Sequence, residues 1–399
     1  MRFVNPYTPG AGFMPSFIAG RDEVIRRAQN SMAALIQRYP QQSVIYYGLR
    51  GVGKTVLLNR IEEIAEENGI LYEHIEIKEK EGFISQIIST STKFIRDISM
   101  KGKAEAFTQK AKEIIKSFTI TFSPKDGNLT AALQNTDDDF EVITNLSDGL
   151  TDVFVALGNA ANKSENTICF FIDEIQYLKR DELEALINAI HRVNQKRLPI
   201  MIFGAGLPKV FKELGDAKSY SERLFVFEEI DALSCEDAKL AICEPAKKDI
   251  GVSYEEKALD RIVKITHRYP YFIQQFCKII WDNTTEDIIS LKDVRASEAE
   301  FYHKLDNGFF RVRYERCTRK EKLFMFAMVK CGDLPCNIAN VAKIMGEDNT
   351  SRVSPIRAQL INKGLIYATG YAEIDFTVPQ FDCFLTRVMP KDDIKLNDI

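Results

Sequence analysis

The stretch GLRGVGKT, residues 48–55, has the spacing G-x-x-x-x-G-K-T. Glycines in such a loop let successive backbone N–H groups close around phosphate oxygens. The ammonium group of Lys54 is expected to contact the β- and γ-phosphates, and the Thr55 hydroxyl is expected to bind Mg²⁺. The residues predicted to hold a nucleotide here are Gly48, Leu49, Arg50, Gly51, Val52, Gly53, Lys54, Thr55 and Val56.

The sequence on both sides of this loop supports the prediction. The motif needs a strand before it and a helix after it. Residues 44–47, VIYY, are β-branched and aromatic, as strands prefer, and residues 56–65 carry apolar side chains at helical spacing. Asn68-Gly69 then supplies a helix stop. The phosphates are therefore expected at the N-terminus of a helix.

A second motif, TICFFIDEIQ, occupies residues 167–176. Its continuous apolar run is typical of a parallel strand that is covered on both faces. Asp173, at the end of this strand, is expected to hold Mg²⁺ directly or through water, and Glu174 is expected to act as general base toward the attacking water. Together the two motifs predict ATP and Mg²⁺ as ligands and ATP hydrolysis as the reaction, with Lys54 and Glu174 as catalytic residues.

Composition limits the other functions that the chain could have. A length of 399 residues favours two or three domains, and a net charge of −4 argues against a globally basic nucleic-acid-binding protein. No apolar run approaches the ~20 residues needed to span a bilayer, and no basic-then-apolar signal peptide is recognisable. The eight cysteines lack a zinc-binding spacing, so we expect reduced thiols in a cytoplasmic protein.

Strands and helices alternate through the first part of the chain. Residues 1–16 are rich in proline and glycine and are expected to form an extended arm. An insertion at 82–143 is expected to hold helices at 83–99 and 103–115 and a hairpin at 116–133. Further expected elements are strands near 70–77, 199–203 and 224–227, and helices at 144–161 and 181–193, the second capped by Asp181. This alternation predicts an α/β fold with a five-stranded parallel sheet.

The second part of the chain follows two different patterns. Helices are expected at 235–248, 255–267 and 270–283. After about residue 309, the pattern predicts helices at 319–329, 338–345 and 351–363, and then a β-turn-β unit with Gly370 at the turn. Pro355 suggests that the regular part of the third helix begins near Ser354. Three helices followed by a hairpin are typical of a winged helix-turn-helix.

With these parts in this order, the chain resembles the bacterial and archaeal AAA+/STAND-type P-loop ATPases related to the replication-initiator, or origin-recognition, branch. The resemblance rests on GRD at 20–22, the two phosphate motifs, IMIFGAGLP at 200–208, SERLFVF at 221–227 and RYPYFIQQ at 268–275. It implies an ATPase core at 17–233, a helical lid at 234–308 and a winged-helix domain at 309–390.

The resemblance also implies roles for residues outside the two phosphate motifs. Gly20 and Arg21 fall where a short box closes near adenine, and Tyr269-Pro270 falls on the lid motif that packs near the base. Arg223 falls at the position of the catalytic arginine that faces a neighbouring subunit's γ-phosphate, which implies a homo-oligomer on ATP binding. A salt bridge with an acidic neighbour is the alternative for Arg223; the candidates are Glu222, Glu228 and Glu229.

Two departures from the family pattern bear on the rate of hydrolysis. The strand at 199–203 should end in a polar sensor residue, but Gly204-Ala205-Gly206 follows it. The lid motif reads Arg268-Tyr269-Pro270, so Arg268 is either a lid sensor for the γ-phosphate or a surface residue. Slow hydrolysis is therefore expected, and a nucleotide-dependent switch is favoured over a fast motor.

The expected winged helix carries a modest basic excess. Basic residues outnumber acidic ones between 311 and 387. The candidates for contact with nucleic acid are Arg352, Arg357 and Lys363. The wing, ATGYAE, has no lysine or arginine at its tip, which argues against strong insertion into a minor groove.

Two functions from different classes follow. The first is an ATPase that couples its nucleotide state to double-stranded DNA through the winged helix. The second is a STAND-type signalling ATPase that oligomerises on ATP and uses its C-terminal domain on a protein partner. DNA-stimulated hydrolysis would favour the first, and ATP-driven oligomers that are indifferent to DNA would favour the second.

Overall fold

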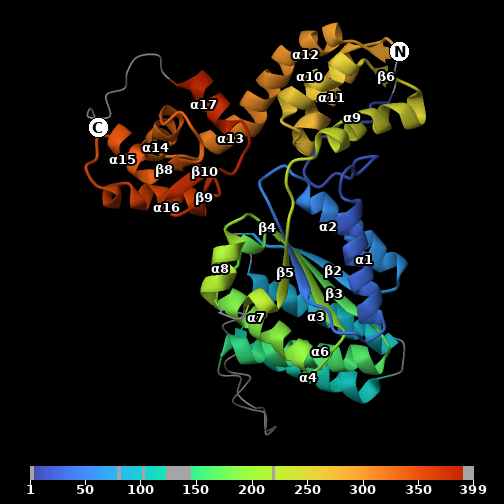
Figure 1. Cartoon of the computed structure of the whole chain (residues 1–399). Helices are drawn as coiled ribbons and strands as arrows, with labels where there is room; N and C mark the ends of the chain where they lie inside the picture. Colours follow the sequence, from blue (N-terminus) through green and yellow to red (C-terminus); the bar gives the residue numbers. More distant parts are fainter. Residues whose placement is uncertain (1–3, 79–81, 101–103, 123–144, 218–220, 390–399) are drawn as a thin grey trace.

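A computed structural model describes residues 4–78, 82–100, 104–122, 145–217 and 221–389. Figure 1 shows an α/β unit below, a group of helices above it, and a C-terminal unit beside that group. The glycine- and proline-rich arm at the N-terminus runs between the α/β unit and the upper helices. No helix in these described ranges has the length and apolar character that crossing a membrane requires.

A parallel five-stranded sheet forms the centre of the α/β unit. Its strands are β1 (Ser43–Tyr47), β2 (Leu71–Glu76), β3 (Ile168–Asp173), β4 (Ile200–Gly206) and β5 (Phe225–Glu229). They lie in the order β2-β3-β4-β1-β5. The prediction of five parallel strands is confirmed. The strand expected at 199–203 continues through Gly204 and Ala205 to Gly206, because these residues still pair with β1.

Helices cover both faces of this sheet. α1 (Asp22–Ile36) and α2 (Lys54–Glu67) pack on one face, with Phe171 and Phe203 of the strands. The other face takes Phe170 and the neighbouring helices α3 (Phe83–Met100), α4 (Glu105–Phe122), α6 (Leu146–Lys163), α7 (Arg180–Gln195) and α8 (Val210–Ala217). Adjacent strand residues point to opposite faces, and every residue of β3, from the apolar run Ile168–Ile172 to Asp173, is buried, so the strand is covered on both sides.

The prediction of a hairpin at 116–133 is wrong for residues 116–122, which are helical. Helix α4 continues through this segment to Phe122, because Ala111, Ile115 and Phe118 recur at helical spacing and are buried. That apolar face belongs to the same core as α6. The β-branched residues of the segment favoured a strand only locally, and packing overrides this preference. The remainder, 123–133, lies outside the described residues.

The expected cap of α7 is also corrected. The helix begins at Arg180, its N-cap is Lys179, and Asp181 lies in the first turn. The backbone N–H of Lys179 donates to Glu182 at 2.9 Å. A carboxylate within the first turn still favours the helix through its dipole, which is the physical basis of the sequence signal.

The upper helices are α9 (Cys235–Ile250), α10 (Glu256–Thr266), α11 (Pro270–Asn283) and α12 (Leu291–Lys304). The three helices predicted between 235 and 283 are confirmed. Two short strands, β6 (Ser253–Tyr254) and β7 (Ile288–Ile289), pair in parallel beside them. A π-helical turn, Leu305–Phe310, and α13 (Arg311–Tyr314) follow α12 without a break in helical backbone.

The C-terminal unit contains α14 (Arg319–Lys330), α15 (Ile338–Ile344), α16 (Ser354–Asn362) and α17 (Phe381–Val388). Its strands β8 (Cys336–Asn337), β9 (Ile366–Gly370) and β10 (Glu373–Phe376) form an antiparallel sheet in the order β8-β10-β9. This arrangement is compatible with the predicted winged helix. The third helix begins at Ser354, as Pro355 suggested.

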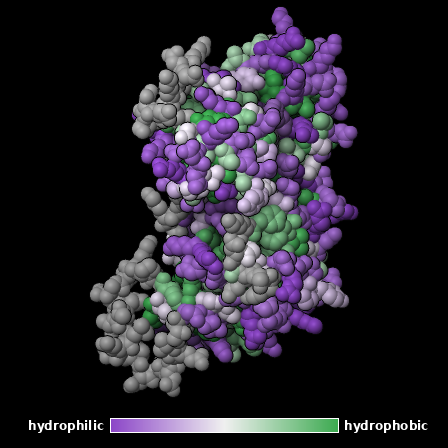
Figure 2. Space-filling view, turned by 60° about the vertical axis from the view of Figure 1, so that its left-hand side comes forward, coloured by the Kyte–Doolittle hydropathy of each residue, from purple (hydrophilic) through white to green (hydrophobic). Residues whose placement is uncertain are grey.

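One apolar core joins the upper helices to the C-terminal unit. Phe310 lies 6.3 Å from Phe272 of α11 and 5.3 Å from Phe384 of α17, measured between ring centroids. Both units contribute to the same buried cluster. The outer face drawn in Figure 2 is mainly hydrophilic, with smaller hydrophobic patches between the charged side chains.

Candidate nucleotide-binding site

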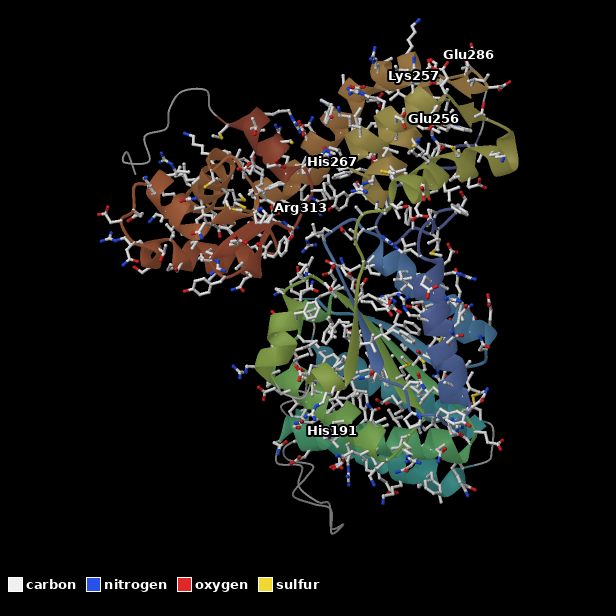
Figure 3. The ribbon with its side chains drawn as sticks, in the orientation of Figure 1. His191, Glu256, Lys257, His267, Glu286 and Arg313 are labelled. Atoms are coloured by element: carbon white, nitrogen blue, oxygen red, sulfur yellow. The ribbon has the colours of Figure 1, made fainter. Side chains whose placement is uncertain are left out.

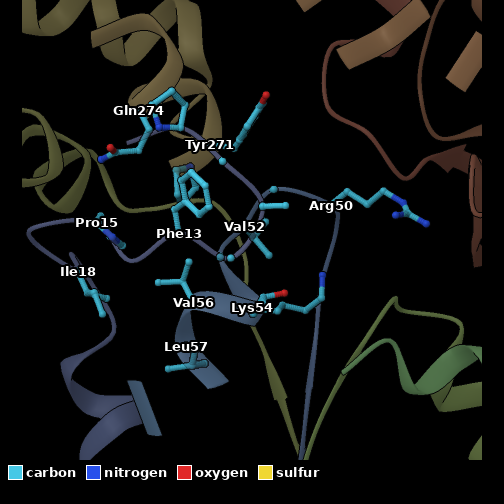
Figure 4. Close-up of a pocket in the computed structure, with 18 of the residues that line it drawn as sticks. Phe13, Pro15, Ile18, Arg50, Val52, Lys54, Val56, Leu57, Tyr271 and Gln274 are labelled. Atoms are coloured by element: carbon cyan, nitrogen blue, oxygen red, sulfur yellow. The ribbon is translucent and has the colours of Figure 1, made fainter. Parts of the chain in front are cut away.

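A cavity of about 620 Å³ opens where the loop after β1, the end of β3, the N-terminal arm and the upper helices meet. This volume is in the range of small-molecule sites. Figure 4 shows Lys54 and Val56 at the floor of this cavity, with Phe13 and Pro15 of the arm on one side and Tyr271 of α11 above. The cavity therefore surrounds the predicted phosphate loop.

Backbone geometry explains the glycines of the loop. Gly51 and Gly53 have φ angles of 84° and 92°, which L-residues with side chains rarely adopt. A Cβ at Gly48 would lie 2.0 Å from the backbone oxygen of Ile230. Helix α2 begins directly after the loop, at Lys54, so the free N–H groups of its first turn face the cavity region. The predicted glycine-rich loop before a helix N-terminus is present.

Lys54 lies inside the cradle. Its Nζ donates to the backbone oxygens of Gly48 at 2.9 Å and Leu49 at 2.8 Å. Burial lowers the pKa of Lys54 to about 8, although the negative charges of Glu174 and Asp173 oppose this shift. Two carbonyl oxygens hold the ammonium group where phosphate oxygens could replace them.

Thr55 and Asp173 form the pair expected for a metal. The Thr55 hydroxyl donates to Oδ2 of Asp173 at 2.6 Å, and Oδ1 of Asp173 accepts from the backbone N–H of Glu174 at 2.8 Å. The described residues hold no group of three or more His, Cys, Asp or Glu side chains that could bind a metal by themselves. This donor set suits Mg²⁺, which takes one or two protein oxygens and completes its shell with waters and phosphate.

Glu174 stands in a left-handed backbone conformation, with φ at 54°. Its carboxylate accepts a hydrogen bond from Nε2 of Gln176. The Oε1 atom of Gln176 accepts from the backbone N–H of Leu207 at 3.0 Å. Because an N–H group can only donate, this contact fixes the orientation of the amide and turns its NH₂ group toward Glu174.

Gln176 lies close to the end of β4. The family pattern has a polar sensor residue at this point, and this sequence has none there. A Cβ at Gly206 would lie 2.8 Å from Oε1 of Gln176. The glycine therefore leaves space for a polar side chain that comes from the segment after β3. Sequence analysis missed Gln176 as a site residue; its only signal was its position two residues after Glu174.

The N-terminal arm forms a wall of the cavity, a role that the sequence did not indicate. The phenyl ring of Phe13 lines the cavity although 64% of the residue is exposed. Tyr7, whose OH donates to the oxygen of Ile242 at 2.6 Å, holds the arm to α9. On the other side, Asn59 of α2 donates to the oxygen of Gly12 at 3.1 Å. Contacts between residues 47 and 235 positions apart in the sequence create this wall.

The residues implied by the resemblance divide into two groups. Arg21 lines the cavity, and its guanidinium donates to the oxygens of Val52 at 3.2 Å and Asp231 at 2.6 Å. Pro270 also lines the cavity. Gly20 and Tyr269 are adjacent to these two in the sequence but do not line the cavity themselves.

Three arginines have positions that the sequence left open. Arg268 is exposed and is not part of the cavity wall. Arg223 is exposed in a short 3₁₀ turn and also lies outside the wall. Its acidic neighbour Glu228 pairs with Arg27 at 2.9 Å. Arg313 of α13 lines the cavity with Lys54 and was missed, because nothing in the sequence brings the two together.

The three candidate nucleic-acid contacts lie outside the cavity wall. Arg352 is exposed, with its Nε 3.7 Å from Glu347. Arg357 is partly buried, and its Nε has no hydrogen-bond partner in the described structure. Lys363 pairs with the buried Glu321 at 2.7 Å, so its charge is already compensated within the domain.

Comparisons with known proteins bear on the family and on the fold of the chain. The model of the AAA ATPase domain matches residues 18–203, and the model of a domain of unknown function, DUF8462, matches residues 307–385. No curated protein matches the chain significantly.

Solved structures with a similar fold include a Walker-type ATPase of Pyrococcus abyssi, with a TM-score of 0.56 and 15% identity over 92% of this chain and 96% of that one. Others are the Orc1 protein of Aeropyrum pernix in complex with DNA (TM-score 0.44, 15% identity, 94% of each chain) and Cdc6p of Pyrobaculum aerophilum (0.45, 15%, 95% and 96%). At this identity, the likeness to the Pyrococcus structure bears on the fold alone.

Proposed function

We propose that the chain binds ATP with Mg²⁺ and slowly hydrolyses its terminal phosphate, and the match of residues 18–203 to the model of the AAA ATPase domain supports this. One observation carries the proposal: the partly buried ammonium group of Lys54 lines a single cavity together with Thr55, Asp173 and Glu174. Such an arrangement places a positive charge, metal ligands and a carboxylate around one group of phosphates.

The residues of the chain would divide the work as follows. Lys54 and the N–H groups at the start of α2 hold the phosphates, while Thr55 and Asp173 hold Mg²⁺, which neutralises charge on the phosphate oxygens. Glu174 accepts the proton of the attacking water. Gln176 holds the Glu174 carboxylate in place by the hydrogen bond described above.

Slow turnover fits two features of the site. The carboxylate of Glu174 must share its oxygens between Gln176 and the water that it activates. Arg223, the residue expected to reach the γ-phosphate of a neighbouring copy, lies on the surface of this single chain. An arginine supplied in trans can raise hydrolysis by about 10³-fold or more. The fastest hydrolysis is therefore expected from an ATP-bound homo-oligomer.

Titration calorimetry with ATP and ADP, with and without Mg²⁺, tests the binding proposal directly. Release of phosphate over time tests hydrolysis. We expect Mg²⁺-dependent binding of ATP and slow phosphate release that rises with protein concentration. A parent protein that binds no nucleotide under these conditions would overturn the proposal.

ATP affinity is expected to fall as the pH rises above 8. The pKa of Lys54 is about 8 without nucleotide, and phosphate oxygens favour the protonated amine, so ATP binding takes up a proton. Each unit of pH above that value should weaken binding by about tenfold, until the pKa in the complex is reached. Calorimetry at several pH values, in two buffers of different ionisation heat, measures both affinity and proton uptake. No uptake at pH 8 would contradict this account of Lys54.

We further propose that nucleotide state is coupled to double-stranded DNA through the C-terminal unit. The support is the compatible three-helix and hairpin order, with the exposed Arg352 just before α16. A STAND-type switch with a protein partner is the second candidate. It is favoured by the compensated charge of Lys363, which leaves less positive charge on this surface for DNA. Light scattering after size exclusion, with ATP analogue and with or without duplex DNA, separates the two.

The double change Arg352→Ala, Arg357→Ala is expected to weaken duplex binding and to leave ATP affinity unchanged. A lost phosphate contact lowers the salt slope by about one unit. Fluorescence anisotropy over a salt series measures this. Arg26→Ala, Arg60→Ala removes the same charge from exposed or partly exposed helix positions of the ATPase core and serves as the control. If the parent shows no salt-sensitive duplex binding, the DNA proposal is wrong.

A further inference from the structure

Arg313 enters the cavity from outside the α/β unit. It belongs to α13, the short helix between the upper helices and the C-terminal unit, and it lines the same cavity as Lys54 and Glu174. Figure 3 shows Arg313 on the side of the C-terminal unit that faces the rest of the molecule. It also lies within residues 307–385, the domain whose function is not known.

The guanidinium of Arg313 has no anionic partner among the described residues. It donates to the backbone oxygen of Phe309 and lies over the ring of that residue, 4.1 Å from the centroid. Burial, together with the nearby positive charge of Arg50, lowers the pKa of Arg313 to about 10. The group is still charged at neutral pH. A partly buried charge without a counter-ion is unfavourable, so an anion in this cavity would stabilise it.

The neighbours of Arg313 indicate which end of the nucleotide it would meet. Arg50 of the phosphate loop and Tyr177, three residues after Glu174, both lie close enough to influence its charge. The oxygen-bearing end of Tyr177 accepts a hydrogen bond from Arg50 at 3.1 Å. The arm residue Phe13 and Ile18 belong to the apolar wall elsewhere in the cavity (Figure 4). Arg313 therefore lies near Arg50 of the phosphate loop, with Tyr271 and Tyr177 also close enough to influence its charge.

The continuous helical segment of α12, the π-helical turn and α13 carries Arg313 to the cavity. The π-helical turn Leu305–Phe310 interrupts the α-helical geometry just before α13. One extra residue in a turn rotates all following side chains by about 100° relative to an uninterrupted helix. The same turn contains Phe309, the ring on which Arg313 rests. Turns of this kind often occur at functional sites.

The C-terminal unit also touches the phosphate loop directly. The backbone N–H of Arg50 donates to the oxygen of Thr377 at 3.1 Å. A Cβ at Gly364 would lie 2.8 Å from Nη2 of Arg50, so this glycine permits the close approach. Two separate contacts, one by backbone and one by side-chain packing, hold the unit against the loop next to Arg313.

We propose that Arg313 binds the terminal phosphate of the nucleotide within the same chain, so that the C-terminal unit is part of the nucleotide site and distinguishes a triphosphate from a diphosphate. This inference rests on the proposed ATP binding. Arginine suits the task because its planar fork can donate two hydrogen bonds to phosphate oxygens. Binding would replace the contact with Phe309 and compensate the charge of Arg313. The unit carrying it would then be held more firmly when the third phosphate is present.

The test compares ATP with ADP in matched variants. Arg313→Ala is expected to lose about tenfold or more in affinity for ATP, the effect of charge-assisted hydrogen bonds, and less than about threefold for ADP. Arg313→Lys keeps the charge but not the fork and should lie between. Arg311→Ala, on the same short helix but exposed and outside the cavity, is the control and should bind both nucleotides like the parent. Calorimetry gives the affinities.

Hydrogen exchange gives a second readout. ATP should protect the backbone amides of residues 305–314 more than ADP does in the parent, and Arg313→Ala should remove that difference. Thermal unfolding without nucleotide confirms that each variant is folded. A parent that binds no nucleotide would refute the proposed function itself. A parent that binds ATP, with an unchanged ratio of ATP to ADP affinity in folded Arg313→Ala, would refute this inference alone.

Discussion

Lys54→Ala is expected to lower ATP affinity by about a hundredfold or more. In the structure, the ammonium group of Lys54 donates to the backbone oxygens of Gly48 and Leu49, and phosphate oxygens could take over both contacts. A charge-assisted hydrogen bond of this kind contributes about 1.5–3 kcal/mol, and two such bonds exceed the ~2.8 kcal/mol that corresponds to a hundredfold change. Calorimetry measures the change.

The same variant makes a second prediction that separates lost binding from lost folding. Lys54 is partly buried, and the desolvation of its ammonium group lowers its pKa, so the site disfavours its charge in the absence of a nucleotide. The nucleotide-free variant should therefore unfold at a temperature no lower than the parent. Arg60→Ala, on the same helix but paired with Glu63 at 2.7 Å, is the control and should bind ATP normally. Parent-like ATP affinity in Lys54→Ala would show that the cradle is not the nucleotide site.

Local chemistry explains why much of the site could be predicted from the sequence. The phosphate loop and the Asp173-Glu174 pair are short, and each follows a strand whose composition marks it clearly. Parallel strands bring their carboxyl ends to one edge of a sheet, so two motifs more than a hundred residues apart had to meet there. The hydrogen bond between Thr55 and Asp173 is the direct result.

The residues that the sequence did not reveal depend on contacts between distant segments. Phe13 reaches the cavity because Tyr7 anchors the arm to α9. Arg313 reaches it because a π-helical turn between α12 and α13 changes the direction of the side chains that follow. Gln176 was near a motif, but its importance depends on the space left by Gly206 in another strand. Periodicity and local propensity contain no information about such contacts.

The error at 116–122 has a different origin. The segment SFTITF alternates β-branched and aromatic residues, which favours a strand when it is considered alone. It also continues the helical spacing of Ala111 and Ile115, and burial against α6 decides between the two. A short apolar run is ambiguous in this way whenever the partner that covers it is not known.

Glu174→Gln is expected to retain ATP binding and to lower hydrolysis by about 10²- to 10⁴-fold, the usual contribution of a general base. The amide has nearly the same shape as the carboxylate, and its oxygen can still accept from Nε2 of Gln176, so the local structure should persist. What the amide cannot do is take the proton of the attacking water. Phosphate release under conditions of saturating ATP measures this loss, and calorimetry confirms binding.

Glu76→Gln is the matched control for this experiment. Glu76 lies opposite Asp173 in the register of strands β2 and β3, and it also lines the cavity. Asp173 is assigned to the metal, so Glu76 is the remaining carboxylate among the described lining residues that could act as a base. Because no hydrogen bond is described between Glu76 and the residues around Lys54, we expect Glu76→Gln to hydrolyse ATP at a rate close to that of the parent. If Glu76→Gln loses hydrolysis while Glu174→Gln keeps it, the base lies on β2, and the mechanism proposed for Glu174 and Gln176 is wrong.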